Sequence, residues 1–312
     1  MCENVIPVII VAGPTAVGKT AVALELAERL NGEIIGADSR QIYRYMDIGT
    51  AKPAPEERTR IPHYLIDIRN PDEAYSAADF ARDASARAHD IVDRGKMPLI
   101  VGGTGLYIHA LLYGIFDGPG KDAAYREKMQ AQADAHGKRF LHEKLRSVDA
   151  VTAKRLHPND TLRIVRALEV FHLTGQPISE HQALHTTPLS RFNACFLVLN
   201  APRPVLYERI DGRVERMVAD GLFEEVEELR QQGYYGDLPS MSSVGYKEIL
   251  DFLHGGCDRA GAVSLIKRNT RRYAKRQVTW FKKYQEAVWL EYEQEAMLCE
   301  QSWHTVCEAF TL

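Results

Sequence analysis

One stretch near the start of the chain limits its possible folds more than any other. Residues Gly13–Thr20 read GPTAVGKT and lie between an apolar run, Val5–Val11, and an Ala/Leu/Glu-rich segment, Ala21–Leu30. This order predicts a strand, a glycine loop and a helix, which is the context a phosphate-binding loop requires. The two glycines let successive N–H groups point inward, and the helix N-terminus favours anions. Lys19 adds a cation and the Thr20 hydroxyl is placed to hold a phosphate-bound Mg²⁺, so the loop predicts a diphosphate or triphosphate site.

Length and composition indicate an ordinary globular protein. The 312 residues, 45% of them hydrophobic and 26% charged, are enough for one large domain or two moderate ones. No apolar stretch approaches a membrane span and no secretory signal is recognisable, so we expect neither. The cysteines are scattered without a C-x-x-C pair, which predicts reduced thiols in a cytoplasmic protein and no zinc site. They are Cys2, Cys195, Cys257, Cys299 and Cys307.

Charge is distributed unevenly along the chain. The net charge of -3 by itself argues against a nucleic-acid partner, yet 264–284 holds eight Lys or Arg residues and no acid, whereas 208–228 is largely acidic. Aromatic residues are interleaved in the basic segment, which favours RNA because phosphates release counterions and unpaired bases stack on aromatic rings. An amphipathic helix with solvated charges would explain the aromatics. It would not explain the lack of acids over about six turns.

Two further polar loops follow predicted strands. Glu33–Ala37 ends in Asp38, and Met97–Val101 runs into the glycine-rich segment Gly102–Tyr107, which carries Thr104. The carboxyl ends of parallel strands meet at one edge of a sheet, so we expect both loops beside the phosphate loop. A helix cap at Asp38 and a plain turn at Thr104 remain alternatives.

The middle of the chain is helical and polar. Helices are expected at 125–135, 140–146, 150–156 and 161–173, and strand character returns only at Cys195–Leu199. We therefore predict an α/β fold, a phosphate-loop NTPase-like parallel sheet flanked by helices, that is interrupted by an all-helical insert. The predicted core is 1–115 and 193–312, including the basic helix, and the insert is 116–192.

Arginines recur at helical spacing in two places. Arg163 and Arg166 share a helical face in the insert, where a solvated basic face and a nucleic-acid contact are both open. Arg209, Arg213 and Arg216 recur on the helix 204–217. They either converge on phosphate oxygens or form ion pairs with neighbouring acids.

From Gly13 to about Tyr284 the chain resembles the tRNA dimethylallyltransferases (tRNA isopentenyltransferases). The resemblance is carried by ordered motifs: Gly13–Thr20, Asp38-Ser39-x-Gln41-x-Tyr43, Gly102–Tyr107, Arg163-x-x-Arg166-Ala167-Leu168-Glu169, Val244–Tyr246 and Ala274-Lys275-Arg276-Gln277-x-Thr279-Trp280. The zinc finger that extends eukaryotic members is not seen, so the bacterial type is expected.

The resemblance implies transfer of a dimethylallyl group from dimethylallyl diphosphate to the N6 amine of the adenosine 3′-adjacent to the anticodon in tRNA. An adenine amine is a poor nucleophile and needs a base, which Asp38 would supply, with Thr104 and Lys19 as further catalytic residues. The implied diphosphate ligands, with Mg²⁺ on Thr20, are Gly13, Thr15, Ala16, Val17, Gly18, Lys19, Thr20 and Arg213, although Arg209 and Arg216 stay open as the arginine. The expected partners are dimethylallyl diphosphate and the tRNA anticodon stem-loop, with no membrane and no obligate protein partner.

The implied tRNA-binding residues come from both parts of the chain, and the target base must leave the anticodon stack to react. They are Asp38, Ser39, Arg40, Gln41, Thr104, Arg126, Leu162, Arg163, Ile164, Val165, Arg166, Ser243, Val244, Gly245, Tyr246, Lys247, Lys275 and Arg276.

Three alternatives remain open. A small-molecule kinase would need a metal-orienting carboxylate at a strand end, for which Asp67 is the only clear candidate. An adenylate isopentenyltransferase would use free AMP, ADP or ATP and would need neither the basic helix nor the insert. A non-catalytic RNA-binding protein would not need polar groups in both strand-end loops.

Overall fold

The computed structural model describes residues 5–116, 118–120, 122–184, 189 and 191–311. Cys2 lies outside these residues, and the other four cysteines are free thiols. The chain divides into two compact units, Met1–Leu111 with Ser190–Leu312 and Leu112–Leu189, which are described separately. None of the described helices combines the length and apolar character needed to span a membrane.

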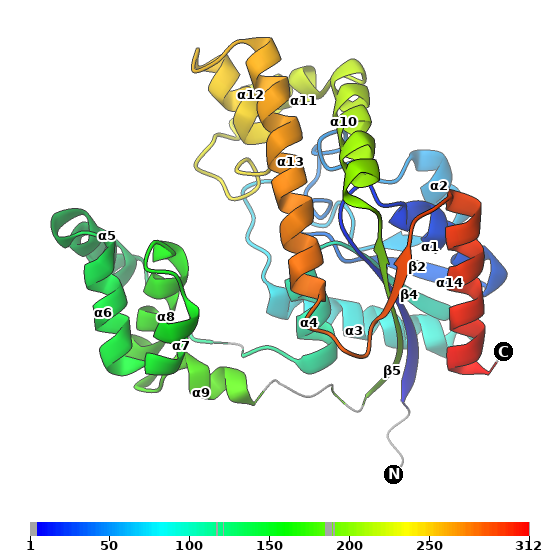
Figure 1. Ribbon diagram of the computed structural model, residues 1–312, viewed down its shortest axis with the longest axis horizontal. Coiled ribbons are helices and arrows are strands. Elements are labelled where there is room, and N and C mark those ends of the chain that lie inside the picture. The colour runs from blue at the N-terminus through cyan, green and yellow to red at the C-terminus, as the bar shows by residue number, and fades with distance from the viewer. Residues whose placement is uncertain (1–4, 117, 121, 185–188, 190, 312) are drawn as a thin grey trace. The chain divides into compact units, whose positions relative to one another are not determined.

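The larger unit is built on a six-stranded parallel sheet with strand order β3-β2-β4-β1-β5-β6 (Figure 1). The predicted α/β fold with a parallel sheet is therefore confirmed. The strands are β1 Ile6–Ala12, β2 Gly32–Gly36, β3 His63–Tyr64, β4 Met97–Gly102, β5 Phe192–Asn200 and β6 Val288–Glu291.

Side-chain alternation along the strands gives the sheet two apolar faces. Ile9 and Val11 of β1 pack in one core with α1 (Lys19–Arg29) and α14 (Glu295–Phe310). Intervening residues such as Ile10 point to the opposite face because successive side chains alternate. There α3 (Ala77–Asp93) packs on β1, β2 and β4. Burial on both faces is the reason that β1 reads as a continuous apolar run.

A second core lies among helices of the same unit. It joins the loop residues Ile42, Tyr43 and Met46 to four helices. These are α10 Arg203–Ala219, α11 Leu222–Gln231, α12 Tyr246–Leu253 and α13 Arg259–Phe281. Helices α10 and α13 run side by side (Figure 1). The unit also contains α2 Pro55–Arg60 and α4 Gly105–Tyr113.

In its described part the smaller unit consists of helices joined by loops, without a strand, and has its own apolar core. Its helices are α5 Ala123–His136, α6 Lys138–Val148, α7 Ala150–Arg155, α8 Thr161–Thr174 and α9 Ile178–Ala183. The Asp160 side chain caps α8 by accepting from the Arg163 N–H, as the Asn-Asp-Thr sequence predicts.

Several element predictions were wrong in detail. The sequence 63–68 favours a strand, but β3 ends at Tyr64 because Leu65 and Asp67 adopt positive φ of 61° and 56°, which an extended strand cannot accommodate. Helix α4 begins at Gly105, inside the predicted polar loop. The segment beyond Glu291, whose sequence carries no recognisable motif, forms α14.

A buried carboxylate organises the smaller unit. The Glu169 side chain has no exposed surface and receives two hydrogen bonds of 2.7 Å from Arg126, one of 2.6 Å from Arg166 and one of 2.9 Å from the Asp122 N–H. Burial alone would raise the pKa of Glu169, but the arginine hydrogen bonds outweigh it and lower the pKa to about 2. Charged donors thus compensate the desolvation of the ion.

We expect Glu169→Gln to lower the free energy of unfolding of this unit by about 3 kcal/mol at pH 7, because two guanidinium groups lose their counter-charge. A depressed carboxyl pKa contributes stability above the ordinary value of 4.5 that disappears as pH falls towards about 2. Denaturant unfolding of both proteins across this range measures the difference. Glu143→Gln is the control because its pair with Arg146 is exposed. Equal losses in the two variants would contradict the role of Glu169.

Candidate active site

The phosphate loop joins β1 to α1 in a strained conformation. Gly13 has φ of 142°, and a Cβ there would lie 2.4 Å from the Leu199 carbonyl oxygen, so only glycine fits. Ala16 also adopts a positive φ, of 65°. The Lys19 ammonium folds back over the loop and donates to the carbonyl oxygens of Gly13 (3.1 Å) and Pro14 (2.8 Å). This conformation is the glycine loop that the sequence predicts between β1 and α1.

Lys19 is part of a concentrated group of cations. Burial and the nearby charge of Arg213 lower the pKa of Lys19 to about 7, although the charge of Asp38 opposes the shift. Burial also lowers the pKa of Arg213. Two desolvated cations facing one carboxylate leave excess positive potential, which an anionic ligand would neutralise.

The loops after β2 and β4 are joined by hydrogen bonds. Thr104 donates its N–H to the Ala37 carbonyl (3.1 Å), and its Oγ1 accepts from the Ser39 N–H (2.9 Å). Asp38 Oδ1 accepts from the Arg40 N–H at 2.8 Å. Within the described part of the chain its other oxygen, Oδ2, has no hydrogen-bond partner. Asp38 is therefore held in place by one oxygen and can accept a proton on the other.

Gln277 of α13 connects the phosphate loop to the loop after β4. Its Oε1 accepts from the Thr15 N–H (2.9 Å) and its Nε2 donates to the Gly103 carbonyl (3.0 Å). The side chain is buried, and a Cβ at Gly103 would lie 2.1 Å from Nε2. Gln277 belonged to a recognised motif but was not predicted as a site residue, because sequence alone does not indicate its two partners.

Tyr273 lies one turn before Gln277 on the same helix and faces the same region. Burial and the nearby Asp38 charge raise the pKa of its phenol to about 12, opposed in part by a hydrogen bond with Thr104. From the sequence, Tyr273 is expected only as one of the aromatics interleaved in the basic segment. Its position four residues before Gln277 is the sequence signal that could have placed it on this face.

The structure separates the three arginines of α10. Arg213 Nη1 donates to Thr15 Oγ1 at 3.4 Å, which places it beside the phosphate loop. Arg209 Nε donates to the Ala16 carbonyl at 2.8 Å, and Arg216 is exposed. Acids of α10 pair instead with α13, Asp211 with Arg271 and Glu215 with Lys267. Within α10, which the structure describes in full, these three arginines therefore do not form ion pairs with the neighbouring acids of the same helix.

One cavity brings these groups together. It has a volume of about 580 Å³ and is lined, among others, by Thr15, Lys19, Thr20, Asp38, Arg213 and Tyr273. Thr20 is exposed on its wall. Among the described residues no group of three or more His, Cys, Asp or Glu side chains could hold a metal. On this wall, the Thr20 hydroxyl is the group that could hold a phosphate-bound Mg²⁺.

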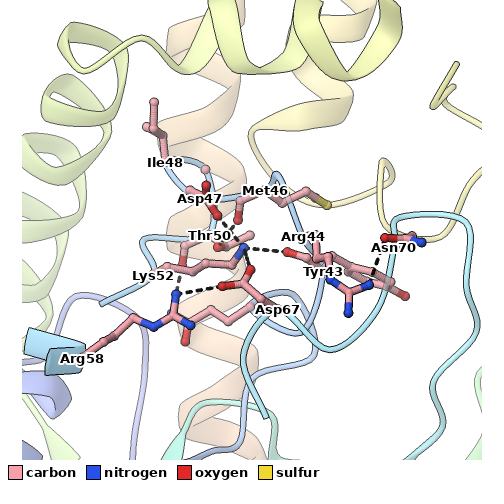
Figure 2. A network of polar contacts seen from close by, with 12 residues as sticks. Tyr43, Arg44, Met46, Asp47, Ile48, Thr50, Lys52, Arg58, Asp67 and Asn70 are labelled. Carbon is pink, nitrogen blue, oxygen red and sulfur yellow. Dashed lines mark hydrogen bonds and ion pairs between the residues drawn. The ribbon is translucent and has the colours of Figure 1, made fainter. Parts of the chain in front are cut away.

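Lys52 anchors the loop beyond Asp38, as Figure 2 shows. Its ammonium, almost fully buried, contacts the Tyr43 carbonyl at 2.6 Å and the Asp47 and Asp67 carboxylates at 2.5 Å each. Asp67 also pairs with Arg58 at 2.8 Å. Asp67 is thus bound to two cations, which argues against the metal-orienting role that a kinase would require of it.

Residues predicted to bind tRNA near Asp38 are largely engaged with the protein. Arg40 Nη1 donates to the Pro239 carbonyl at 2.7 Å. Gln41 Nε2 donates to the carbonyls of Thr50 (3.2 Å) and Ala51 (3.0 Å). These contacts fix the loop shape and leave Ser39 and Arg40 partly exposed.

In the predicted tRNA-binding stretch 243–247 most side chains face inward. Tyr246 is fully buried and donates to Glu225 Oε1 at 2.6 Å, and Ser243 is buried against the Ser240 carbonyl. Gly245 is also buried and Val244 is half-buried, whereas Lys247 is exposed. The side chains of Ser243 and Tyr246 thus have partners within the protein, and the expected RNA contacts of this stretch stay a prediction.

The basic helix α13 has two charged sides. Lys267 and Arg271 pair with the acids of α10. Its other cations are exposed at helical spacing and, in the chain as described, form no ion pair. Apart from Arg259 at the start of the helix, which lies over the Phe223 ring, they are Arg268, Arg272, Lys275 and Arg276, which we call the basic face. Acids of α10 thus neutralise only one side of α13.

The smaller unit contains the remaining predicted residues. Leu162 is 87% exposed, and Arg163 is exposed beside Asp160 at 3.0 Å. The side chains of Ile164 and Val165 belong to the apolar core of this unit, and their place in an RNA-binding segment stays a prediction. Arg126 and Arg166 both hold Glu169 and remain about a third exposed, at 37% and 33%.

Comparison with known proteins identifies the family. A sequence model of the IPP transferase family matches residues 41–284. The chain is 52% identical to tRNA dimethylallyltransferase 2 of Geotalea uraniireducens over 298 residues, which cover 95% of this chain and 96% of that protein. It is 51% identical to tRNA dimethylallyltransferase of Geobacter metallireducens over 284 residues, covering 91% and 92%.

Solved structures agree with these relatives. The full-length tRNA isopentenylpyrophosphate transferase from Bacillus halodurans aligns with a TM-score of 0.72 at 39% identity, covering 99% of this chain and 97% of that one. A eukaryotic dimethylallyltransferase acting on tRNA aligns with a TM-score of 0.76 at 29% identity, covering 91% and 73%. The glycine loop and the parallel sheet agree with these likenesses. The chain therefore belongs to the tRNA dimethylallyltransferase family.

Proposed function

We propose that this protein transfers a dimethylallyl group from dimethylallyl diphosphate to the N6 amine of the adenosine 3′-adjacent to the anticodon in tRNA. The observation that carries the proposal is the cavity in which Lys19, Arg213 and Asp38 meet. Its cations suit a diphosphate and its carboxylate suits a proton acceptor. Relatives that carry the name tRNA dimethylallyltransferase support the same reaction.

The phosphate loop and its cations would bind the diphosphate and favour its departure. The carbon–oxygen bond of the donor breaks, and negative charge accumulates on the leaving oxygen. Lys19, Arg213 and the loop N–H groups are fixed before the reaction, so they stabilise this charge without reorganising. Mg²⁺ held by Thr20 and the diphosphate would supply further neutralisation of the leaving group.

Asp38 would act as general base on the acceptor. As the new carbon–nitrogen bond forms, one proton leaves the N6 amine, and Asp38 Oδ2 is free to take it. Thr104 orients Asp38 through the Ser39 N–H, and Tyr273 contacts Thr104. The raised pKa of Tyr273 keeps the phenol protonated at neutral pH, so it can donate a hydrogen bond and cannot compete as the base.

The acceptor is expected to be the anticodon stem-loop of tRNA. The basic face of α13 offers four exposed cations to a phosphate backbone, and the adenosine would have to leave the stack to reach a cavity. A free nucleotide, the acceptor of an adenylate isopentenyltransferase, would not need such a face. We further propose that the enzyme works as a cytoplasmic monomer without an obligate protein partner.

One product analysis tests the whole proposal. The protein is incubated with dimethylallyl diphosphate and either an isolated anticodon stem-loop or free AMP, ADP and ATP, and the nucleosides are identified by mass spectrometry. Isopentenyladenosine is expected in the stem-loop only. Prenylated free nucleotide without prenylated RNA would favour the adenylate enzyme, and a phosphorylated small acceptor would favour a kinase.

We expect Asp38→Asn to lower turnover by ~10²-fold or more while tRNA affinity stays nearly unchanged, as for the loss of a general base. Single-turnover rates and filter binding measure the two effects. Asp93→Asn, at an exposed position of α3, is the matched control. A near-normal rate for Asp38→Asn would remove it from the role of base.

We expect neutralisation of Lys275 and Arg276 to glutamine to weaken tRNA binding and to reduce the slope of log affinity against log salt by roughly 1.5, because each phosphate contact releases counterions. The control removes equal charge from α3 by Arg82→Gln and Arg87→Gln, both exposed. If the two double variants have the same slope, the basic face does not bind RNA.

The pKa of Lys19 predicts a pH dependence of donor binding. A bound diphosphate should raise this pKa from about 7, so binding takes up a proton and affinity falls as pH rises above 7. Calorimetry with the thiolo analogue of the donor at pH 8, in two buffers of different ionisation enthalpy, measures the proton. Identical heats in both buffers would contradict this assignment.

A further inference from the structure

Arg209 links the phosphate loop to the C-terminal segment of the chain. Its Nε donates to the Ala16 carbonyl at 2.8 Å, and its Nη1 donates to the Tyr292 hydroxyl at 2.6 Å. The guanidinium also stacks on the Tyr292 ring, with its carbon 4.3 Å from the ring centroid. Arg209 is thus held by Tyr292 through a hydrogen bond and a cation–π contact at once.

Tyr292 is itself firmly placed. It directly follows β6, and its N–H donates to the Asn200 carbonyl at the end of β5 at 2.7 Å. The next helix, α14, packs on α1, and Leu298 joins the core beneath the sheet. The hydroxyl that orients Arg209 therefore comes from a rigid part of the fold.

The contact falls at the strained residue of the phosphate loop. Ala16 has φ of 65°, a left-handed conformation that is unfavourable for a residue with a side chain. The C=O and N–H of a trans peptide point in opposite directions. A guanidinium that fixes the Ala16 oxygen therefore also fixes the direction of the Val17 N–H, one of the loop groups expected to bind phosphate.

We propose that Tyr292 is a positioning residue for the phosphate loop, acting through Arg209 on the peptide between Ala16 and Val17. The proposal rests on the proposed function, in which that loop binds the donor diphosphate. It assigns Arg209 to the shape of the loop and leaves the direct diphosphate contact to Arg213. It also gives a role in donor binding to a segment whose sequence carries no recognisable motif.

The test removes the phenol oxygen alone. We expect Tyr292→Phe to raise the KM for dimethylallyl diphosphate and the Kd of its thiolo analogue by about 5-fold, the scale of one lost charged hydrogen bond. The KM for the RNA and the melting temperature should stay unchanged. A purely structural role would instead change melting temperature and both KM values together, and that result would overturn the proposal.

Tyr207→Phe is the matched control. Tyr207 lies on α10, its hydroxyl accepts from Arg203 Nε at 2.9 Å, and the Arg203 guanidinium carbon lies 5.1 Å from its ring centroid; among the described residues it has no hydrogen bond to the phosphate loop. This variant should bind the donor as the wild type does. An equal loss in both variants, or no loss in Tyr292→Phe, would overturn the proposal.

A double-mutant cycle tests the path through Arg209. If Tyr292 acts through this side chain, Tyr292→Phe should have little further effect on donor affinity in an Arg209→Lys background. Additive losses of donor affinity would show that Tyr292 does not act through Arg209 and would overturn the proposal.

Failure of the proposed function is distinguishable from failure of this inference. The first appears in the wild type, as absence of prenylated RNA. In that case calorimetry with inorganic diphosphate still tests whether Tyr292 positions the phosphate loop. Weaker binding of diphosphate by Tyr292→Phe than by Tyr207→Phe supports the positioning role. Equal binding by the two variants, or no binding of diphosphate by the wild type, overturns it.

Discussion

The side chain of Gln277 is the contact on which the arrangement of the site depends. One amide group accepts from the phosphate loop at Thr15 and donates to the loop after β4 at Gly103. Because the amide is buried, losing either bond would leave a polar group without water. Gln277 therefore fixes the distance between the two loops and also fixes α13 against both. The same helix presents Tyr273 to the cavity and the basic face to solvent, so one element relates the diphosphate site, the base and the expected RNA surface.

Charge in the larger unit is sorted by tertiary contacts. Acids of α10 neutralise one side of α13, which leaves the other side basic. Within the cavity the reverse holds, since Lys19 and Arg213 exceed the single carboxylate of Asp38. A protein with net charge of -3 can thus present positive potential at two places, and a small and a large anion would be attracted to different surfaces.

Sequence reasoning succeeded where chemistry is encoded locally. The glycine loop needs Gly13 because the Leu199 oxygen occupies the space of a side chain, and the helix after it needs only an amphipathic pattern. Asp38 and Thr104 follow apolar strands, so parallel topology alone brings them together. Sequence reasoning could not assign exposure. Ile164, Val165, Ser243 and Tyr246 lie in segments with family motifs, yet their side chains face a core or a buried partner, and which way a side chain faces depends on how its segment packs.

By itself the sequence determined the sheet, the phosphate loop and the residues at the ends of β2 and β4, because hydrophobic periodicity and glycine positions act over a few residues. Only the tertiary structure decided that Arg209 and Arg213 of α10 line the cavity and Arg216 does not, since the rotation of that helix depends on its packing against α13. The tertiary structure alone also showed that Arg209 links Tyr292 to Ala16, which lies 276 residues earlier in the chain. Contacts between such distant residues depend on how β5, β6 and α14 pack, and no local pattern in the sequence records that packing.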